Sequence, residues 1–514
     1  LYARGASLAQ AHRAIRRAGG RILRENRRIG LATVAARSHA FVRRAARAAA
    51  IQGAAANRTI GHLPGLPPSR RIESERGFAA TRSATPAAAP PPAEPLSAGQ
   101  WDMRMMHATP DGSYAAQTGS HDVRVGVIDT GVDGSHPDIK PNFDPVLSRN
   151  FTVDDPLIDG PCAEEPDGSC NDPADVDEDG HGTHVAGTIG APLNGVGIGG
   201  VAPGVDIVNL RAGQDSGFFF LQPTVDALTY AGDNGIDVVN MSFFTDPWLY
   251  NCRNNPADSP EEQQQQATII DATQRALDYA RRRGVTLVAA LGNENTDLGK
   301  PTVDETSPDY PPGTERTRQV DNSCLDMPTE GHGVIAVAAL GPSQRKAYYS
   351  NYGVEQTDVS APGGDRREFF GTDRYNAPDT RVLAPMPEGV AQAELAGDPA
   401  NPLIVEDCTG GTCAHYQWLQ GTSMASPHAA GVAALIVAQF GKKDSDHGGL
   451  TLAPAKVKSI LERTATRHAC PDTNPFTYPD PDLTPDFTAS CEGDAKFNGF
   501  YGHGIVDALD AVVG

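Results

Sequence analysis

The stretch Val-Arg-Val-Gly-Val-Ile-Asp (123–129) decides the fold class of this 514-residue chain. It is a mostly apolar run that ends in a carboxylate, which is typical of a strand buried on both faces of a sheet. Further apolar runs occupy residues 205–210, 236–241, 285–291 and 334–339, and helical patterns lie between them, as at 224–234 and 267–283. Strands that alternate with helices predict an α/β fold, a mostly parallel sheet covered by helices on both faces.

Three polar residues stand in dense local motifs of this predicted fold. Asp129 follows the first strand, His181 opens His-Gly-Thr-His-Val-Ala-Gly-Thr (181–188), and Ser423 lies in Gly-Thr-Ser-Met-Ala-Ser-Pro-His (421–428). A serine hydroxyl becomes a nucleophile when a histidine takes its proton and a carboxylate holds the other histidine nitrogen. The chain order Asp, His, Ser is one of three unrelated orders in which this triad occurs.

In these motifs and their order the chain resembles the subtilisin-like serine peptidases (subtilases), over residues 94–514. The resemblance implies a serine endopeptidase that acts on polypeptides without a catalytic cofactor, with Asp129, His181 and Ser423 as its triad. It also implies an oxyanion hole made by Asn293, in Ala-Ala-Leu-Gly-Asn-Glu-Asn (289–295), and by the backbone N–H of Ser423.

Substrate is expected to bind as an extended strand between two segments of this domain. One segment contains Ser216 and Gly217, and the other contains Ser242 and Phe243. Nearby, the aromatic run 218–220 either lines apolar subsites or packs in the core.

Asp326 aligns with the base of the family's S1 pocket, where an acid would favour a basic P1 residue. A solvated loop aspartate is the alternative. Phe243 and Phe244 favour an apolar pocket rim instead, so the P1 preference stays open at this point.

Calcium is the one cofactor that the resemblance implies, as a structural ion. Its carboxylate and amide ligands would be Asp138, Asn194 and Glu94. Backbone carbonyls would complete the oxygen shell, from Pro192, Val196 and Ile198. The alternative is a loop held by hydrogen bonds alone.

The N-terminal segment differs in charge and pattern from the rest. Residues 1–83 carry a net charge of +14, and the remainder carries −35. Within residues 1–63 a helix is predicted at 7–18, strands at 21–26 and 29–35, and a second helix at 38–50. This α+β pattern resembles the inhibitor-type propeptide of subtilases, with its first strand truncated. We expect the basic module to bind its own acidic domain rather than nucleic acid.

A proline- and alanine-rich linker at 64–93 follows this module, and it is the expected site of propeptide cleavage. Loop insertions are predicted at 154–180, 246–266 and 365–418. Each of them carries at least one cysteine.

The eight cysteines contain no Cys-x-x-Cys pair. Proximity in sequence favours pairs 162/170, 408/413 and 470/491, which leaves 252/324, and reduced thiols are the alternative. Disulfides would place the protein outside the cell. No apolar run reaches the roughly 18 residues of a membrane helix, so no membrane span is predicted. We expect a secreted protein whose targeting segment is not part of this sequence.

Two other functions remain to be weighed. A degenerate pseudo-protease that only binds peptides would need a broken triad, and all three triad residues are present. The other is a calcium-stabilised adhesion protein. A serine-directed inhibitor probe separates the enzyme from both.

Overall fold

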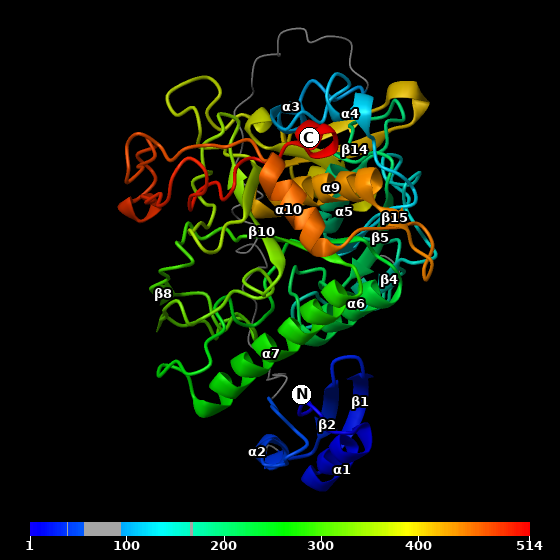
Figure 1. Cartoon of the computed structure of the whole chain (residues 1–514), viewed down its shortest axis with the longest axis vertical. Coiled ribbons are helices and arrows are strands. Elements are labelled where there is room, and N and C mark those ends of the chain that lie inside the picture. The colour runs from blue at the N-terminus through cyan, green and yellow to red at the C-terminus, as the bar shows by residue number, and fades with distance from the viewer. Residues whose placement is uncertain (39, 56–93, 165–167) are drawn as a thin grey trace.

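The computed structural model describes residues 1–38, 40–55, 94–164 and 168–514 (Figure 1). A small N-terminal module within residues 1–55 lies against a larger body that begins at residue 94. The predicted linker at 64–93 lies outside the described residues, as does the predicted end of the module at 56–63.

A parallel sheet of seven strands forms the centre of the body, as predicted. Its order is β11-β10-β7-β6-β3-β5-β4, and all neighbouring pairs are parallel. The strands are Arg124–Ile128 (β3), Arg149–Asn150 (β4), Asp206–Arg211 (β5), Val238–Met241 (β6), Thr286–Ala290 (β7), Val334–Leu340 (β10) and Val359–Pro362 (β11). The sequence predicts five of these strands but not the edge strands β4 and β11.

Helices cover both faces of the sheet (Figure 1). One face packs against His181–Gly190 (α5), Thr422–Phe440 (α9), Pro454–Thr464 (α10) and Ala508–Val513 (α11), and the other against Leu221–Asp233 (α6) and Pro260–Arg282 (α7). Alternate strand residues therefore enter different cores. Val127 of β3 packs with α5 and α9, whereas Ile128 packs with α6 and α7. Burial on both faces explains why the strands are apolar without alternation.

Helix α9 bears on the predicted absence of a membrane span. It is the one helix of the described chain that is long and apolar enough, on average, to cross a membrane, with a mean hydropathy of 1.2. Ser423, Ser426 and His428 interrupt its apolar residues, so it is not an unbroken apolar run. In addition, 83% of the apolar stretch is buried inside the protein, as befits the core helix of the body.

The N-terminal module has the predicted order of elements. Its helices and strands are Leu8–Ala18 (α1), Gly20–Asn26 (β1), Leu31–Ala36 (β2) and Ala40–Ala46 (α2), and β1 pairs antiparallel with β2. Gly19 ends α1 in the left-handed conformation, with φ of 93°. Helix α2 is shorter than predicted, and Tyr2 forms an antiparallel bridge with Ile51.

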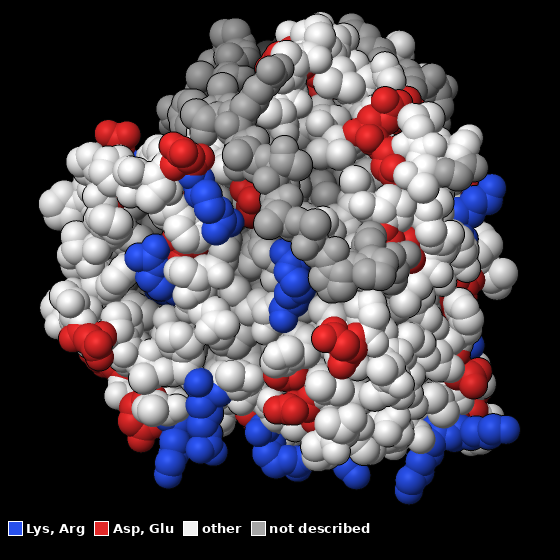
Figure 2. Space-filling model, turned by 90° about the horizontal axis from the view of Figure 1, so that it is seen from above, with Lys and Arg blue, Asp and Glu red and all other residues white. Residues whose placement is uncertain are grey.

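The module rests on α6 and α7. Ion pairs join Arg24 Nε to Asp226 Oδ2 at 2.6 Å and Arg28 Nε to Asp233 Oδ2 at 2.8 Å. Arg275 of α7 donates to the backbone oxygens of Tyr2 and Ile29 at 2.9 and 3.0 Å. The apolar residues Ile29 and Leu31 join the core cluster that lies beneath α6 and α7. On the face of the body away from the module, acidic and basic side chains are interspersed (Figure 2).

Helix α7 begins earlier than predicted, because part of the predicted loop 246–266 is helical. Ser259 caps it through a capping box with Glu262, and Pro260 occupies its first turn. The capping residues are visible in the sequence. However, the polar residues that follow them show no apolar residue at helical spacing, so the sequence does not predict the first turns of the helix.

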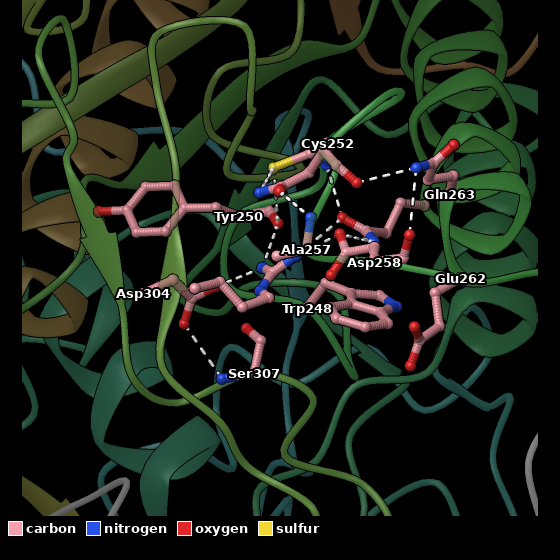
Figure 3. Close-up of polar contacts among 12 residues, drawn as sticks. Trp248, Tyr250, Cys252, Ala257, Asp258, Glu262, Gln263, Asp304 and Ser307 are labelled. Atoms are coloured by element: carbon pink, nitrogen blue, oxygen red, sulfur yellow. Dashed lines mark hydrogen bonds and ion pairs between the residues drawn. The ribbon is translucent and has the colours of Figure 1, made fainter. Parts of the chain in front are cut away.

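A buried arginine joins the start of α7 to a second loop, residues 303–320. The Arg318 guanidinium donates to Asp258 Oδ2 and to the Tyr250 carbonyl, both at 2.8 Å, and also contacts Asp304. It lies 4.6 Å from the ring centre of Trp248. Figure 3 shows these partners gathered beside the start of α7. The two loops therefore form one unit around a polar core, and the short pair Val303–Asp304 (β8) and Arg318–Gln319 (β9) lies within it.

The insertion 365–418 is more regular than a loop. It contains Val382–Met386 (β12), Ile404–Asp407 (β13) and Ala414–Leu419 (β14), which form an antiparallel sheet, and Glu388–Gly397 (α8). Other short elements are Trp101–Met105 (α3), Ser113–Ala116 (α4), Lys442–Lys443 (β15) and Leu450–Thr451 (β16).

All eight cysteines form disulfides, in the predicted pairs. These are Cys162–Cys170, Cys252–Cys324, Cys408–Cys413 and Cys470–Cys491. The Cys252–Cys324 disulfide closes the unit around Arg318, and Cys470–Cys491 closes a lobe near the C-terminus.

Candidate active site

The carboxylate of Asp129 holds the imidazole of His181. Asp129 follows the end of β3 and is fully buried, and His181 is the first residue of α5. Their Oδ1 and Nδ1 atoms lie 2.7 Å apart. Asp129 Oδ1 also accepts the backbone N–H of Thr130 at 2.8 Å. A carboxylate in this position orients the ring and stabilises its charged form.

A second buried carboxylate, Asp177, supports this pair, and the sequence does not single it out. Its Oδ2 accepts the backbone N–H of Thr183 at 3.0 Å and the hydroxyl of the same residue at 2.6 Å. Its Oδ1 accepts the Thr130 hydroxyl at 3.2 Å. Asp177 thus ties the start of α5 to the turn after Asp129. An acid just before a helix start is a recognisable signal for such a role.

Ser423 is the second residue of α9 and lies beside the carboxyl end of β6. Its hydroxyl donates to the backbone oxygen of Ser242 at 3.4 Å. The Ser242 hydroxyl donates to the Ser423 carbonyl at 3.2 Å and lies 2.8 Å from the Ser426 hydroxyl. The serine is therefore placed at a helix N-terminus, where the helix dipole favours negative charge.

Asn293 follows β7 and is oriented by Thr422, the residue before Ser423. The backbone N–H of Thr422 donates to Asn293 Oδ1 at 2.9 Å, and the Thr422 hydroxyl lies 3.0 Å from the same atom. Because Oδ1 faces these donors, the amino group of Asn293 points away from them. Asn293 is only half-buried, so its amino group is free to donate a hydrogen bond on the side away from Thr422.

His184, the other histidine of the motif, has a structural role. Its Nε2 lies 3.2 Å from the Val382 carbonyl and 3.1 Å from the Gln417 carbonyl, which join α5 to β12 and β14. Burial lowers the pKa of His184 to about 3, so the ring is neutral at physiological pH.

The segment with Ser216 and Gly217 is already engaged by the insertion at 154–164. The backbone N–H of Ser216 donates to Asp159 Oδ1 at 2.8 Å, and Gln214 accepts the N–H of Asp155 at 2.7 Å. Buried Arg211 pairs with Asp154 and Asp215, both at 2.8 Å. The insertion therefore braces this expected wall of the substrate groove.

The aromatic residues near the groove contribute to packing. Phe243 stacks on the buried Phe219, with ring centres 4.0 Å apart. Phe244 packs against the cluster of Leu249 and Tyr250. Phe218 and Phe220 both contact Tyr310, with ring centres 6.0 and 4.9 Å away. These contacts weaken the argument for an apolar S1 rim built from Phe243 and Phe244.

Asp326 is buried between the two segments that carry Ser242 and Asn293. The N–H of Thr245 donates to the carbonyl of Met327 at 2.7 Å, and the Thr329 hydroxyl donates to the Ala290 carbonyl at 2.7 Å. Asp326 itself is only 2% exposed. It is thus not a solvated loop aspartate, which was the alternative reading of the sequence.

The surroundings of Asp326 are acidic. Burial, with the nearby carboxylates of Glu330 and Glu294, raises the pKa of Asp326 well above its ordinary range. Burial likewise raises the pKa of Glu330 to about 7. Among the described residues, the Asp326 Oδ1 atom has no hydrogen-bond partner. A buried carboxyl group without a partner is suited to receive a cation.

Two of the three side chains expected to bind calcium face each other in the interior. Asp138 is fully buried, and its Oδ2 accepts the Ile198 N–H at 2.9 Å and the Tyr416 hydroxyl at 3.2 Å. Glu94 accepts the Gly195 N–H at 2.8 Å. Burial raises the pKa of Asp138 to about 8 and that of Glu94 to about 7, and the charge of the Glu94 carboxylate adds to the shift of Asp138.

Asn194 is the third side chain, and it is exposed. Its Nδ2 donates to the Pro137 carbonyl at 3.3 Å and its Oδ1 accepts the Val196 N–H at 2.9 Å. In the described part of the chain, the Oδ1 of Asp138 is buried without a partner. The carboxylates of Asp138 and Glu94 therefore fit a hard cation, with Asn194 at the edge of the same loop.

A buried Asp–His pair, a helix-borne serine and an oriented asparagine at the carboxyl edge of a parallel sheet are the arrangement expected of a serine hydrolase site. The sequence model of the subtilase family matches residues 120–504. The chain therefore belongs to the subtilase family and is a subtilisin-like serine protease.

Relatives with known sequences or structures agree with this family. The chain is 27% identical to subtilisin DY of Bacillus licheniformis, over 67% of this chain and 84% of that protein. It is also 27% identical to the epidermin leader peptide-processing serine protease EpiP of Staphylococcus epidermidis, over 70% and 68%. The crystal structure of EpiP from Staphylococcus aureus has a similar fold, with a TM-score of 0.63 at 21% identity, over 99% and 96% of the two chains.

Proposed function

We propose that this protein is a secreted serine endopeptidase in which Asp129, His181 and Ser423 form the catalytic triad. The observation that carries the proposal is the 2.7 Å contact between Asp129 and the Nδ1 atom of His181. This contact leaves Nε2 as the base that removes the hydroxyl proton of Ser423. His181 then returns that proton to the leaving amine.

The proposed oxyanion hole consists of the Asn293 amino group and the backbone N–H of Ser423. Attack on a peptide carbonyl places negative charge on its oxygen, and donors already held in position stabilise that charge. The bond from Thr422 to Asn293 Oδ1 supports this role, because it orients the amino group before substrate arrives.

We propose further that the enzyme prefers a basic P1 residue. The support is the buried carboxyl group of Asp326, whose Oδ1 atom has no hydrogen-bond partner among the described residues, and its acidic neighbour Glu330. An arginine or lysine side chain would form charge-assisted hydrogen bonds with Asp326. The backbone of Ser216, Gly217, Ser242 and Phe243 would hold the rest of the peptide as an extended strand.

The N-terminal module is proposed to be a propeptide that binds and inhibits the enzyme. Its ion pairs and apolar contacts with α6 and α7 support this role. The disulfides support a location outside the cell, where they are stable. A calcium ion held by Asp138, Glu94 and Asn194 would supply structural stability and no catalytic chemistry.

A serine-directed phosphonate or sulfonyl fluoride tests the proposal directly. We expect the probe to label Ser423 and to abolish hydrolysis of a peptide library, with the modified residue identified by mass spectrometry. A pseudo-protease or an adhesion protein would remain unlabelled at Ser423 and would cleave no peptide.

A further inference from the structure

Lys346 is a buried lysine outside the residues that would touch substrate. Only 2% of it is exposed, and burial lowers its pKa to about 7. In the described structure its Nζ atom pairs with no carboxylate. Removing an ammonium group from water is costly unless other groups replace the lost hydration. The neighbours of Lys346 therefore indicate what the residue holds in place.

An aromatic cage surrounds the ammonium group. Its Nζ lies 5.0 Å from the ring centre of Tyr352, 5.8 Å from that of Tyr478 and 5.7 Å from that of Phe500. Cation–π attraction replaces part of the lost hydration. Tyr478 belongs to the lobe closed by the Cys470–Cys491 disulfide, and its hydroxyl donates to the backbone oxygen of Lys346 at 2.8 Å.

The strongest hydrogen bond of the ammonium group goes to the loop that carries Asn293. Lys346 Nζ donates to Asn295 Oδ1 at 2.6 Å, and a second bond reaches the Ala347 carbonyl at 3.1 Å. Asn295 Nδ2 donates in turn to the carbonyl of Asp486, in the disulfide-closed lobe, at 3.1 Å. Both ends of the Asn295 side chain are therefore fixed.

The backbone at Asn295 needs such support. Its φ of 53° lies in the left-handed region, which costs energy for residues other than glycine. Its N–H donates to the Tyr349 carbonyl at 2.7 Å. Asn351 accepts the N–H of Thr296 at 2.8 Å, and its own N–H donates to the Gly292 carbonyl at 2.9 Å. The segment that follows Lys346 thus fastens the Asn293 loop on both sides of Asn293.

We propose that Lys346 is a positioning residue for the oxyanion hole, which it serves by fixing Asn295 and so the direction of the Asn293 amino group. This inference rests on the proposed role of Asn293. The contribution of a preorganised donor depends strongly on its placement, and small displacements lower the rate of the chemical step. Lys346 touches no substrate, so substrate binding should not depend on it.

A double-mutant cycle with Lys346→Met and Asn293→Ala tests the inference. Methionine keeps the unbranched apolar stem and removes the ammonium donor. We expect Lys346→Met to lower kcat about tenfold with KM nearly unchanged. In the Asn293→Ala background, Lys346→Met should have no further effect on kcat. Active-site titration normalises each rate to the correctly folded enzyme.

Lys458→Met is the matched control, because Lys458 lies on α10 and pairs with Asp358 at 2.7 Å, away from the site. Its kcat should match that of the wild type. Asn295→Gly serves if Lys346→Met does not fold, since glycine adopts a positive φ freely while the side-chain bonds to Lys346 and to the Asp486 carbonyl are lost. It should lower kcat in the same way.

The possible outcomes separate this inference from the proposed function. If Lys346→Met and Asn295→Gly both have the kcat of the wild type, the positioning role of Lys346 is overturned. The proposed role of Asn293 is then unaffected. A tenfold loss that persists in the Asn293→Ala background shows that Lys346 acts elsewhere, and it too overturns the inference. An unchanged kcat in Asn293→Ala alone overturns the proposed oxyanion hole, and the role of Lys346 with it.

Discussion

Ser423 and Ser242 exchange hydrogen bonds: the Ser423 hydroxyl donates to the Ser242 carbonyl, and the Ser242 hydroxyl donates to the Ser423 carbonyl. Only the first of these bonds involves the Ser423 hydroxyl, the proposed nucleophile. The second uses the backbone of Ser423 and survives its truncation. The start of α9 is therefore fixed independently of the Ser423 side chain.

Ser423→Ala should abolish peptide hydrolysis and leave the body folded. We expect kcat to fall on the order of 10⁵–10⁶-fold, because the triad acts as a unit. The melting temperature should change little, since the bond from Ser242 remains. Peptide hydrolysis and thermal unfolding of the purified variant check both points, and undiminished hydrolysis would refute the triad.

The same variant should accumulate as an unprocessed precursor. If the enzyme cleaves its own linker, loss of the nucleophile leaves residues 64–93 intact. N-terminal sequencing of wild type and Ser423→Ala, purified in the same way, provides the test. Active wild-type enzyme that retains Leu1 as its only N-terminus would contradict the prediction.

The double substitution Arg24→Glu and Arg28→Glu should release the module from the body. Both side chains pair with acids of α6, and the new glutamates would face those acids. We expect segment 1–63 with both changes, added in trans, to inhibit on the order of 10-fold more weakly at low salt. Arg16→Glu together with Arg17→Glu, an equal charge change at two exposed positions of α1, is the control. Equal inhibition by all three fragments would argue against docking through these pairs.

Calcium removal should lower the melting temperature of the processed enzyme. A ligand bound by the native state alone stabilises that state by mass action. The loss with excess chelator should disappear in Asp138→Asn, which lacks the buried carboxylate, and Asp144→Asn is a control outside the proposed site. A wild-type melting temperature that does not respond to chelator would reject the site.

The proposed S1 pocket predicts a pH dependence that differs between substrates. Because burial raises the pKa of Asp326 well above its ordinary range, this group loses its proton at a higher pH than a solvated aspartate does. It must lose the proton to pair with arginine, so kcat/KM for P1 arginine should rise with pH more steeply than for P1 leucine. Asp326→Asn should remove the difference. Identical arginine-to-leucine ratios in both proteins at every pH would show that Asp326 does not contact the P1 residue.

The sequence predicts what local pattern determines. Strands buried on both faces are mostly apolar, as in β3, or apolar throughout, as in β10, and the residues of the proposed triad stand in motifs with fixed neighbours. The disulfide pairs followed from proximity and the even number of cysteines. The helices of the N-terminal module followed from their apolar period.

Contacts between distant side chains could not be predicted in this way. Arg318 binds Asp258 across sixty residues, and no local pattern announces that pair. The link from Thr422 to Asn293 joins two motifs that the sequence shows only separately. Likewise, the burial of Asp326 depends on segments folded around it, so the sequence left its role open.

Helix α7 reaches from the polar core around Arg318 to the N-terminal module. Its 23 residues span about 35 Å. Gln266, near its start, accepts the Cys252 N–H at 2.6 Å, whereas Arg275, further along, holds the module. The contacts with the Arg318 unit and the contacts with the module therefore lie on separate turns of the same helix. The Arg318 unit could be replaced without changing the residues that bind the module. Protein engineers could attach different loops to the first turns of α7 and so change the surroundings of the proposed S1 pocket around Asp326. The surface of α7 that binds the module would stay as it is.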